Sequence, residues 1–307
     1  MIEILNLTKR FSRHIAVDNL SLHVGSGEVL GVLGVNGAGK TTTMRMLTGF
    51  LAPTSGTIRI LGLDVRRQTL QVQQQIGYLP EGAPCYVEMR VGGFLEFIAG
   101  ARGYRGAERR ERVERAIDML ELGGVVGLPI TQLSKGFVRR VGLAQAILHD
   151  PKILILDEPT DGLDPNQKHK VRELIRRYGQ DKTVVISTHL LEEVSAICSR
   201  AVILGAGKVL ADSSPEELRR RCRYYQAVTL LIDGPIDLMA LAMLPGVAGV
   251  EERKTGHCFT ILARPGAVIF PAVSALVASR GWQVKALELE RGRLDEVFRK
   301  ITKAGKP

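Results

Sequence analysis

Residues 28–42 read EVLGVLGVNGAGKTT, an apolar run that leads into a glycine-rich segment. Its first part, residues 28–34, is a compact apolar segment that predicts a buried strand, and helical spacing begins at Thr41 and continues to residue 51. Residues 34–41 match the pattern G-x-x-x-x-G-K-[ST] in the strand-to-helix context that this pattern requires. We therefore expect a strand, a glycine-rich loop and a helix in succession.

The glycine-rich loop has the chemistry of a phosphate-binding site. Its glycines allow backbone N–H groups to turn inward around a phosphate, and the N-terminus of the next helix adds partial positive charge. Lys40 reaches the β/γ oxygens of a nucleotide, and the Thr41 hydroxyl is a ligand for Mg²⁺. The predicted nucleotide-binding residues of the loop are Gly34, Asn36, Gly37, Ala38, Gly39, Lys40, Thr41 and Thr42.

Two carboxylates follow a second apolar strand pattern. Residues 153–158 read ILILDE, so Asp157 and Glu158 stand at the C-terminal edge of the strand, where α/β sheets bind ligands. Side chains alternate along a strand, and the two carboxylates therefore point differently. We expect Asp157 to act on Mg²⁺, directly or through water, and Glu158 to polarise an attacking water as the general base.

Composition restricts the class of protein. The chain has 307 residues, 45% of them apolar and 24% charged, which excludes disordered, collagen-like and disulfide-framework proteins. The net charge of +10 favours an anionic partner. The four cysteines have no metal-ligand spacing, so we expect reduced thiols in a cytosolic protein without a structural metal. We expect no secretory signal, because the N-terminal segment MIEILNLTKRF is charged and has no long apolar stretch. We expect no membrane span, because two aspartates and two prolines interrupt the most apolar later segment, 227–250.

Strand and helix patterns predict two domains. Residues 1–212 carry strand patterns at 2–7, 16–24 and 57–61, and later strands that alternate with helices, as in a parallel sheet. Apolar spacing predicts a helical subdomain at about 85–150 within this part. Residues 213–223 predict a capped connector helix. Residues 224–307 predict a small α+β domain with a split βαββαβ order and a final helix.

A third motif makes the chain resemble a known family. Residues 133–137 read LSKGF, and Arg139 and Arg140 follow them. With the phosphate loop and the carboxylate pair, this segment resembles the LSGGQ signature of the ATP-binding subunits of ABC transporters, with Lys135 replacing a glycine and Phe137 a glutamine. It is similar to the variant in ATPases that serve ABC-2 exporters, including gliding-motility and multidrug ATPases. The resemblance implies an α/β P-loop ATPase domain with a helical subdomain and an antiparallel β subdomain. The small C-terminal α+β domain, ferredoxin-like in its βαββαβ order, rests on the strand and helix pattern of residues 224–307.

The resemblance also implies roles for residues outside the phosphate loop. The signature residues Ser134, Lys135 and Gly136 would meet the γ-phosphate across a head-to-tail dimer. Asp164, in the segment TDGLD, would belong to the family's D-loop, and Phe11 would stack its ring on adenine.

Two further implied positions concern the γ-phosphate and the metal. His189, in the segment STHL, stands where the family has its γ-phosphate-sensing histidine. Glu81, in the segment IGYLPE, stands where the family usually has a glutamine. A carboxylate is also a hard oxygen ligand for Mg²⁺, so Glu81 joins Thr41 and Asp157 as a candidate metal ligand.

The implied function is ATP hydrolysis that drives a membrane transporter. Two ATP molecules, with Mg²⁺, would lie between two copies of the chain, and closing and opening of this homodimer would move membrane-spanning permease subunits of the ABC-2 type. The protein would lie in the cytoplasm, peripherally on the inner face of the membrane. The alternative is a soluble ABC-type ATPase that acts on nucleic acid or ribosomes. We expect no nucleic-acid partner, because the arginines of residues 102–115 alternate with glutamates and no aromatic cluster accompanies them.

Overall fold

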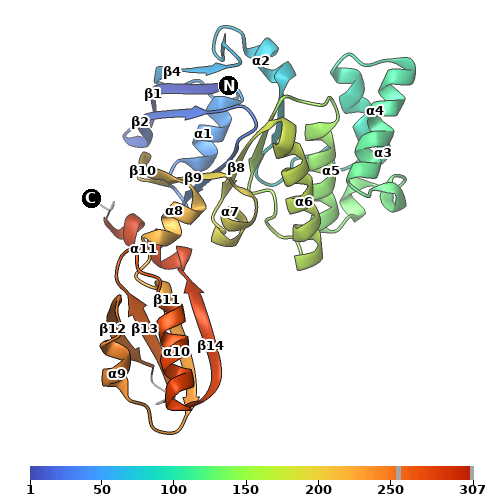
Figure 1. Ribbon diagram of the computed structural model, residues 1–307. Coiled ribbons are helices and arrows are strands. Elements are labelled where there is room, and N and C mark those ends of the chain that lie inside the picture. Colours follow the sequence, from blue (N-terminus) through green and yellow to red (C-terminus); the bar gives the residue numbers. More distant parts are fainter. Residues whose placement is uncertain (254–256, 305–307) are drawn as a thin grey trace. The chain divides into compact units, whose positions relative to one another are not determined.

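The computed structural model describes residues 1–253 and 257–304 (Figure 1). The chain divides into two compact units, one formed by Met1–Ser214 with residues from 302 onward, and the other by Pro215–Ile301. Apolar side chains form two clusters of buried residues in the first unit and one in the second. Within the described residues, none of the helices has the length and apolar character needed to cross a membrane.

A six-stranded sheet forms the centre of the first unit. Its strand order is β10-β9-β3-β8-β7-β6, and all neighbours are parallel except β10, which pairs antiparallel with β9. Every residue of β3, β7 and β8 is buried, which accounts for their nearly continuous Val, Ile and Leu sequences. The strands are β3 (Val29–Gly34), β6 (Ile76–Leu79), β7 (Ile153–Asp157), β8 (Thr183–Thr188), β9 (Arg200–Gly205) and β10 (Lys208–Ser213).

The register of this sheet places the ends of three strands side by side. Asp157 at the end of β7 is opposite Ser187 of β8, and Thr188 of β8 is opposite Leu33 of β3. The two sequence motifs, more than a hundred residues apart, therefore meet at one edge of the sheet. Helices follow these strands in the chain: α1 (Lys40–Leu47), α6 (Pro165–Asp181) and α7 (Leu191–Ile197).

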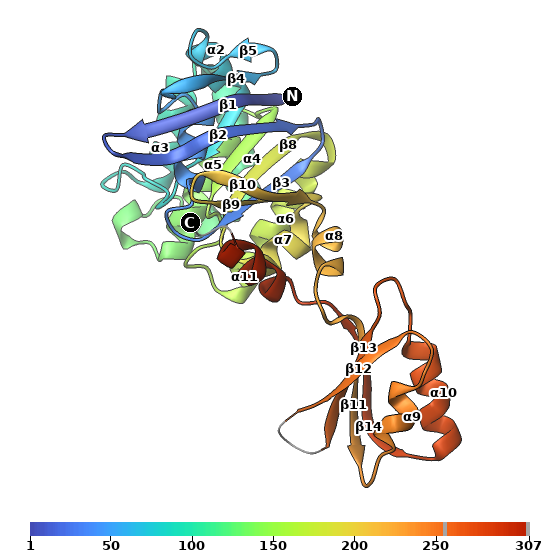
Figure 2. The ribbon, with the colours of Figure 1, turned by 90° about the vertical axis from the view of Figure 1, so that its left-hand side faces the viewer.

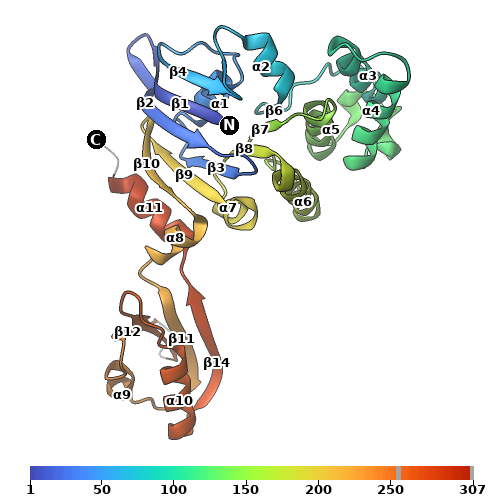
Figure 3. The same ribbon diagram turned by 45° about the horizontal axis from the view of Figure 1, so that its top comes forward.

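A second, antiparallel sheet and a group of helices complete the first unit. The sheet has the order β2-β1-β4-β5. In Figure 3, β1, β2 and β4 lie at one end of the unit, and α3 and α4 lie at the other. The elements are β1 (Ile2–Phe11), β2 (His14–Val24), β4 (Ser55–Ile60), β5 (Leu63–Asp64), α2 (Thr69–Gln75), α3 (Val91–Ala101), α4 (Gly106–Met119), the 3₁₀ turns η1 (Gly123–Val125) and η2 (Ile130–Gln132), and α5 (Lys135–Ile147).

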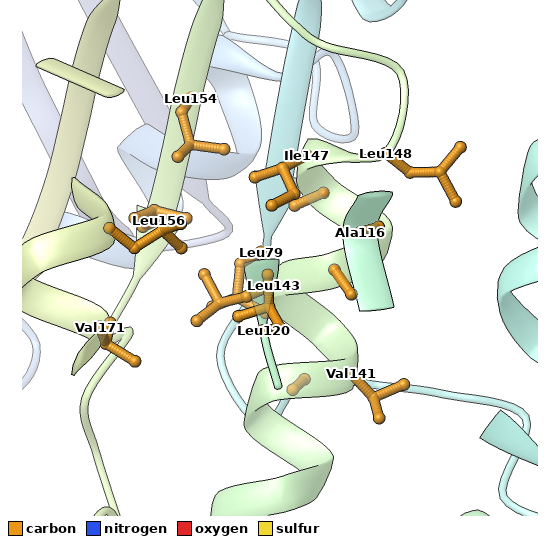
Figure 4. Packing of buried hydrophobic residues seen from close by; sticks show 14 of the residues in the cluster. Leu79, Ala116, Leu120, Val141, Leu143, Ile147, Leu148, Leu154, Leu156 and Val171 are labelled. Carbon is orange, nitrogen blue, oxygen red and sulfur yellow. The ribbon is translucent and has the colours of Figure 1, made fainter. Parts of the chain in front are cut away.

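Helix α5 packs both against the helical group and against the central sheet. In Figure 4, Val141, Leu143 and Ile147 of α5 lie among apolar side chains of α4 and of the strands β6 and β7. Gly142 of α5 allows this close packing, because a Cβ there would lie 2.8 Å from both Ala83 Cβ and Leu79 Cδ1. The signature motif, residues 133–137, includes the N-terminus of α5, so this packing anchors it relative to the carboxylates of β7.

The second unit contains a four-stranded antiparallel sheet in the order β12-β13-β11-β14. Figure 2 shows α9 and α10 on one face of this sheet. Its apolar cluster includes Val228, Ile261 and Val273, which are fully buried. The elements of the unit are α8 (Pro215–Arg220), β11 (Tyr225–Asp233), α9 (Leu238–Ala242), β12 (Val247–Glu252), β13 (Cys258–Ala263), α10 (Phe270–Arg280), β14 (Gln283–Arg291) and α11 (Leu294–Ala304), of which residues 302–304 belong to the first unit.

Several element ends differ from the predictions made from sequence. The helix after the phosphate loop ends at Leu47 rather than at residue 51, because Gly49 has a left-handed φ of 74°. The first strand continues to Phe11 rather than ending at residue 7, and Phe11 pairs with His14 of β2 across a tight turn. Strand β10 was not predicted. The connector helix is shorter than 213–223 and spans only Pro215–Arg220.

Candidate functional site

A cleft of about 390 Å³ lies over the phosphate loop. Four segments line it: the β1–β2 turn, the phosphate loop with the start of α1, the segment after β6, and the end of β7. The lining residues are Phe11, His14, Ala16, Val35, Asn36, Gly37, Ala38, Gly39, Lys40, Thr41, Thr42, Glu81 and Glu158.

The backbone of the phosphate loop requires glycine at two positions in particular. Gly39, the residue before α1, has a φ of 101°, and a Cβ there would lie 2.4 Å from the carbonyl oxygen of Ala16. Gly34 ends β3, and a Cβ there would lie 2.7 Å from Ala38 Cβ. The loop is therefore packed directly against the β1–β2 segment, which brings Phe11 and His14 to the cleft. Lys40 is 7% exposed, and its Nζ donates to the carbonyl oxygen of Gly34 at 2.7 Å.

Glu158 connects the phosphate loop with the end of β8. One carboxylate oxygen, Oε1, is 3.8 Å from Lys40 Nζ, and the other, Oε2, accepts a hydrogen bond from His189 Nδ1 at 2.8 Å. The side chain of Glu158 is 14% exposed and that of His189 is 49% exposed. The φ of Glu158 is +51°, a left-handed conformation that turns the chain away from the strand. A carboxylate held between a cation and an imidazole is suited to accept a proton from water.

Asp157 is fully buried and lies one residue away. Ser187 Oγ donates to its Oδ1, whereas its Oδ2 is buried and has no hydrogen-bond partner among the residues that the structure describes. A buried anionic oxygen without a partner is costly unless a cation reaches it. Thr41 and Glu81, both on the cleft lining, add a hydroxyl and a carboxylate. These oxygen donors fit Mg²⁺, although no group of three or more His, Cys, Asp or Glu side chains suited to a metal occurs within residues 1–253 and 257–304.

Arg139 of α5 holds the segment that carries both carboxylates. Its guanidinium donates to the carbonyl oxygens of Asp157 at 3.1 Å, of Pro159 at 3.3 Å and of Pro80 at 3.5 Å, and also to that of Glu158. Arg139 is 5% exposed, and burial lowers the pKa of its guanidinium, while nearby acidic groups oppose this shift. This side chain joins α5, the end of β7 and the residue before Glu81.

The signature and D-loop residues lie outside the cleft of their own chain. Ser134 caps α5, since its Oγ accepts from Phe137 N at 3.4 Å, and Lys135 and Gly136 begin the helix. Asp164 caps α6 in a capping box with Gln167. None of Ser134, Lys135, Gly136 and Asp164 is among the residues that line the cleft.

Sequence reasoning missed five residues of this site. His14, Ala16 and Val35 line the cleft, Ser187 donates to the carboxylate of Asp157, and Arg139 donates to the carbonyl oxygen of Asp157. His14 lies three residues after Phe11, and Ser187 lies two residues before His189. Each could therefore have been proposed because it is close in sequence to a predicted site residue. Arg139 follows the signature segment, but its contacts to β7 depend on tertiary packing.

Comparisons with known proteins agree on one family. The family profile described as ABC transporter matches residues 17–161. An uncharacterized ABC transporter ATP-binding protein of Bacillus subtilis (strain 168), YxlF, is 38% identical, and the alignment covers 99% of this chain and 100% of that protein. The Nod factor export ATP-binding protein I of Paraburkholderia xenovorans (strain LB400) is 36% identical over 86% of this chain and 87% of that protein.

Solved structures resemble the first unit. The dimeric structure of a bacterial ABC transporter cassette has a TM-score of 0.66 and 26% identity, and covers 70% of this chain and 99% of that chain. A dimeric post-hydrolysis state of an ATP-binding cassette, bound to ADP and Pi, has a TM-score of 0.65 with the same identity and coverage. The chain therefore belongs to the ABC transporter family, as one of its ATP-binding subunits.

Proposed function

We propose that Glu158 is the general base for ATP hydrolysis in this subunit, and that the cleft over the phosphate loop holds the ATP. The position of Glu158 between Lys40 and His189 carries this proposal. Lys40 and the loop N–H groups bind the phosphates, and Phe11, which is 46% exposed, offers its ring to adenine. Glu158 accepts the proton of a water whose oxygen attacks the γ-phosphorus, and the bond to the ADP oxygen breaks.

The other side chains orient this reaction. His189 holds the second carboxylate oxygen of Glu158, so that Oε1 faces Lys40 and the phosphate. Thr41, Asp157 and Glu81 would hold Mg²⁺, which would neutralise charge on the phosphate oxygens. The unpartnered Oδ2 of Asp157 supports this assignment.

A second copy of the chain would complete the site. The signature residues Ser134, Lys135 and Gly136 do not line their own cleft, and related cassettes form dimers. In our proposal these residues, and Asp164, face the ATP of the partner copy. Lys135 places a positive charge where the related signature has a glycine, which favours contact with a phosphate.

The motion of this dimer would drive permease subunits of the ABC-2 type. The relatives support export, since one is named for Nod factor export and another, of Escherichia coli, is named as a probable multidrug protein of which this chain covers 38%. The net charge of +10 suits a peripheral position on the anionic inner membrane surface. Affinity purification tests the proposed pairing with permease subunits. Co-purification of a membrane protein of about six spans supports this pairing, and recovery of ribosomes or DNA instead contradicts it.

Replacement of Glu158 by Gln tests the catalytic assignment. The Glu158→Gln variant should bind ATP and accumulate as a dimer, because the change slows hydrolysis and keeps the phosphate contacts. Gel filtration with ATP and an assay of phosphate release measure both effects. The matched control is Glu88→Gln, an exposed carboxylate outside the cleft, which should behave as wild type. A Glu158→Gln variant that hydrolyses ATP at the wild-type rate would show that another group is the base.

A further inference from the structure

The second unit contains a cavity whose lining is strongly basic. Its volume is about 600 Å³, larger than that of the ATP cleft and within the range of small-molecule sites, about 300–1,000 Å³. The lining comes from two segments, residues 220–226 between α8 and β11, and residues 263–268 between β13 and α10. Four arginines belong to this lining: Arg220, Arg221, Arg223 and Arg264. No Asp or Glu side chain occurs among the lining residues that the structure describes.

The antiparallel sheet brings these two segments together. Val228 of β11 pairs with Ile261 of β13, so the start of β11 lies beside the end of β13. Arg264 N of the 263–268 loop donates to the carbonyl oxygen of Gly246 at 2.8 Å, and Ala267 N donates within the loop to that of Arg264 at 3.0 Å. Backbone hydrogen bonds therefore hold this wall of the cavity.

The guanidinium groups remain accessible although neighbours orient them. The side chains of Arg220 and Arg223 are 64% and 65% exposed, and each faces a carboxylate outside the lining, Glu216 at 3.9 Å and Glu251 respectively. Arg264 Nε donates to the carbonyl oxygen of Val247 at 3.1 Å, a neutral partner, and Arg264 makes no ion pair with any described residue. The local charge is therefore positive.

The chemistry of this lining suits a phosphate rather than a single carboxylate. A guanidinium offers a planar set of donors that matches phosphate oxygens, and a phosphate monoester carries about −1.5 to −2 charges at neutral pH. The remaining wall is apolar, with Pro265, Ala267 and the 67% exposed Val268. The volume leaves room for an organic group beside the phosphate.

We propose that this arginine cavity of the second unit binds an organic phosphate, either a small soluble molecule or the headgroup of an anionic lipid. The arginines contact the phosphate oxygens, with Arg264 as the member whose charge no carboxylate balances. The 263–268 loop contacts the organic group. This site is separate from the ATP cleft, and the proposal does not depend on the catalytic role of Glu158.

The test uses the full chain with a Lys40→Ala change, which removes the phosphate-binding lysine of the ATP cleft. Calorimetric titration with glycerol 3-phosphate measures the soluble source, and co-sedimentation with phosphatidic acid vesicles, against phosphatidylcholine vesicles, measures the lipid source. We expect saturable binding in at least one arm. Adding Arg220→Gln and Arg264→Gln should weaken it by about tenfold or more, because charge-assisted hydrogen bonds are lost.

Two comparisons keep the test specific. The control pair Arg280→Gln and Lys285→Gln removes the same charge from the same unit, outside the cavity lining, and should leave binding unchanged. The Val268→Glu variant places a carboxylate on the exposed apolar wall and should abolish binding independently. Absence of binding in both arms, or an equal loss in the control pair, would overturn the proposal.

Discussion

His149 is a buried histidine whose surroundings exclude its charged form. It follows α5, is 7% exposed, and its Nε2 lies 3.0 Å from the carbonyl oxygen of Ile76, to which the neutral ring donates. Its Nδ1 is buried without a partner. Burial, and then the nearby charge of Arg102, lower the pKa of His149 to about 3. Protonation at Nδ1 would therefore place an unpaired charge inside the protein.

This histidine should make the protein sensitive to acid. Its pKa is ordinary, about 6.5, in the unfolded chain, so between pH 6.5 and 3 the unfolded state binds more protons and stability falls as the pH falls. From pH 7.5 to 5 we expect a loss of about 2 kcal/mol in unfolding free energy from this group. Urea unfolding measures the unfolding free energy at both pH values. The loss between pH 7.5 and 5 should be about 2 kcal/mol smaller in a His149→Gln variant than in the wild type. His169→Gln, at an exposed position, is the control, and parallel losses in wild type and His149→Gln would contradict the argument.

At the scale of elements, one side chain connects a helix to the catalytic strand. Arg139 of α5 donates to the carbonyl oxygens of Asp157, Glu158 and Pro159, where the chain leaves β7 in a left-handed conformation. These carbonyl groups lie at the end of β7 and just after it, and a buried carbonyl without a donor costs about 1–3 kcal/mol. The orientation of Glu158 thus depends on the position of α5.

Replacement of Arg139 by Met should weaken the link between α5 and the end of β7. The variant keeps the apolar stem but loses the donors, so Glu158 is held less accurately, and we expect ATP hydrolysis to fall by about tenfold or more while ATP binding is largely kept. Steady-state ATPase assays and equilibrium ATP binding measure the two quantities. The control is Arg110→Met, on the exposed surface of α4, which should hydrolyse ATP like wild type. Equal activity in both variants would show that Arg139 does not position the carboxylate.

Local patterns predicted the phosphate loop and the ILILDE strand, because each motif lies between elements with their own hydrophobic periodicity. Helix ends were harder, and α1 stops at Leu47 because of Gly49 rather than at the later proline turn. The contacts of Arg139 and the hydrogen bond from Ser187 to Asp157 were not predictable, because they join residues that only the folded sheet brings together. The arginine cavity depends in the same way on the β11–β13 register.

At the scale of the whole molecule, the two units have separate apolar cores. Ile155 is fully buried in a cluster of the first unit, and Ile261 is fully buried in that of the second. All residues that line the ATP cleft belong to the first unit. Ligand binding stabilises only the structure that forms the site, by an amount that depends on ligand concentration.

Calorimetry of core variants should distinguish the units. Ile261→Ala should lower the unfolding temperature of the second unit, since such changes cost about 2–5 kcal/mol, and leave the ATP-dependent stabilisation of the first unit unchanged. Ile155→Ala, the matched variant, should lower the unfolding temperature of the first unit, which ATP binding raises. Differential scanning calorimetry with and without ATP and Mg²⁺ measures both. A single transition that ATP shifts equally in the two variants would refute independent cores.

The order of strands in the central sheet has a consequence for synthesis on the ribosome. Strand β3, which carries the phosphate loop, pairs with β8 and β9, whose residues are 183–188 and 200–205. A nascent chain that has not yet released residue 205 therefore exposes β3 with at least one unpaired edge. The helices α3, α4 and α5 contact one another and lie within residues 91–147, so their mutual contacts can form earlier. About two thirds of the polypeptide, residues 1–205, must therefore have left the exit tunnel before β3 can pair at both of its edges.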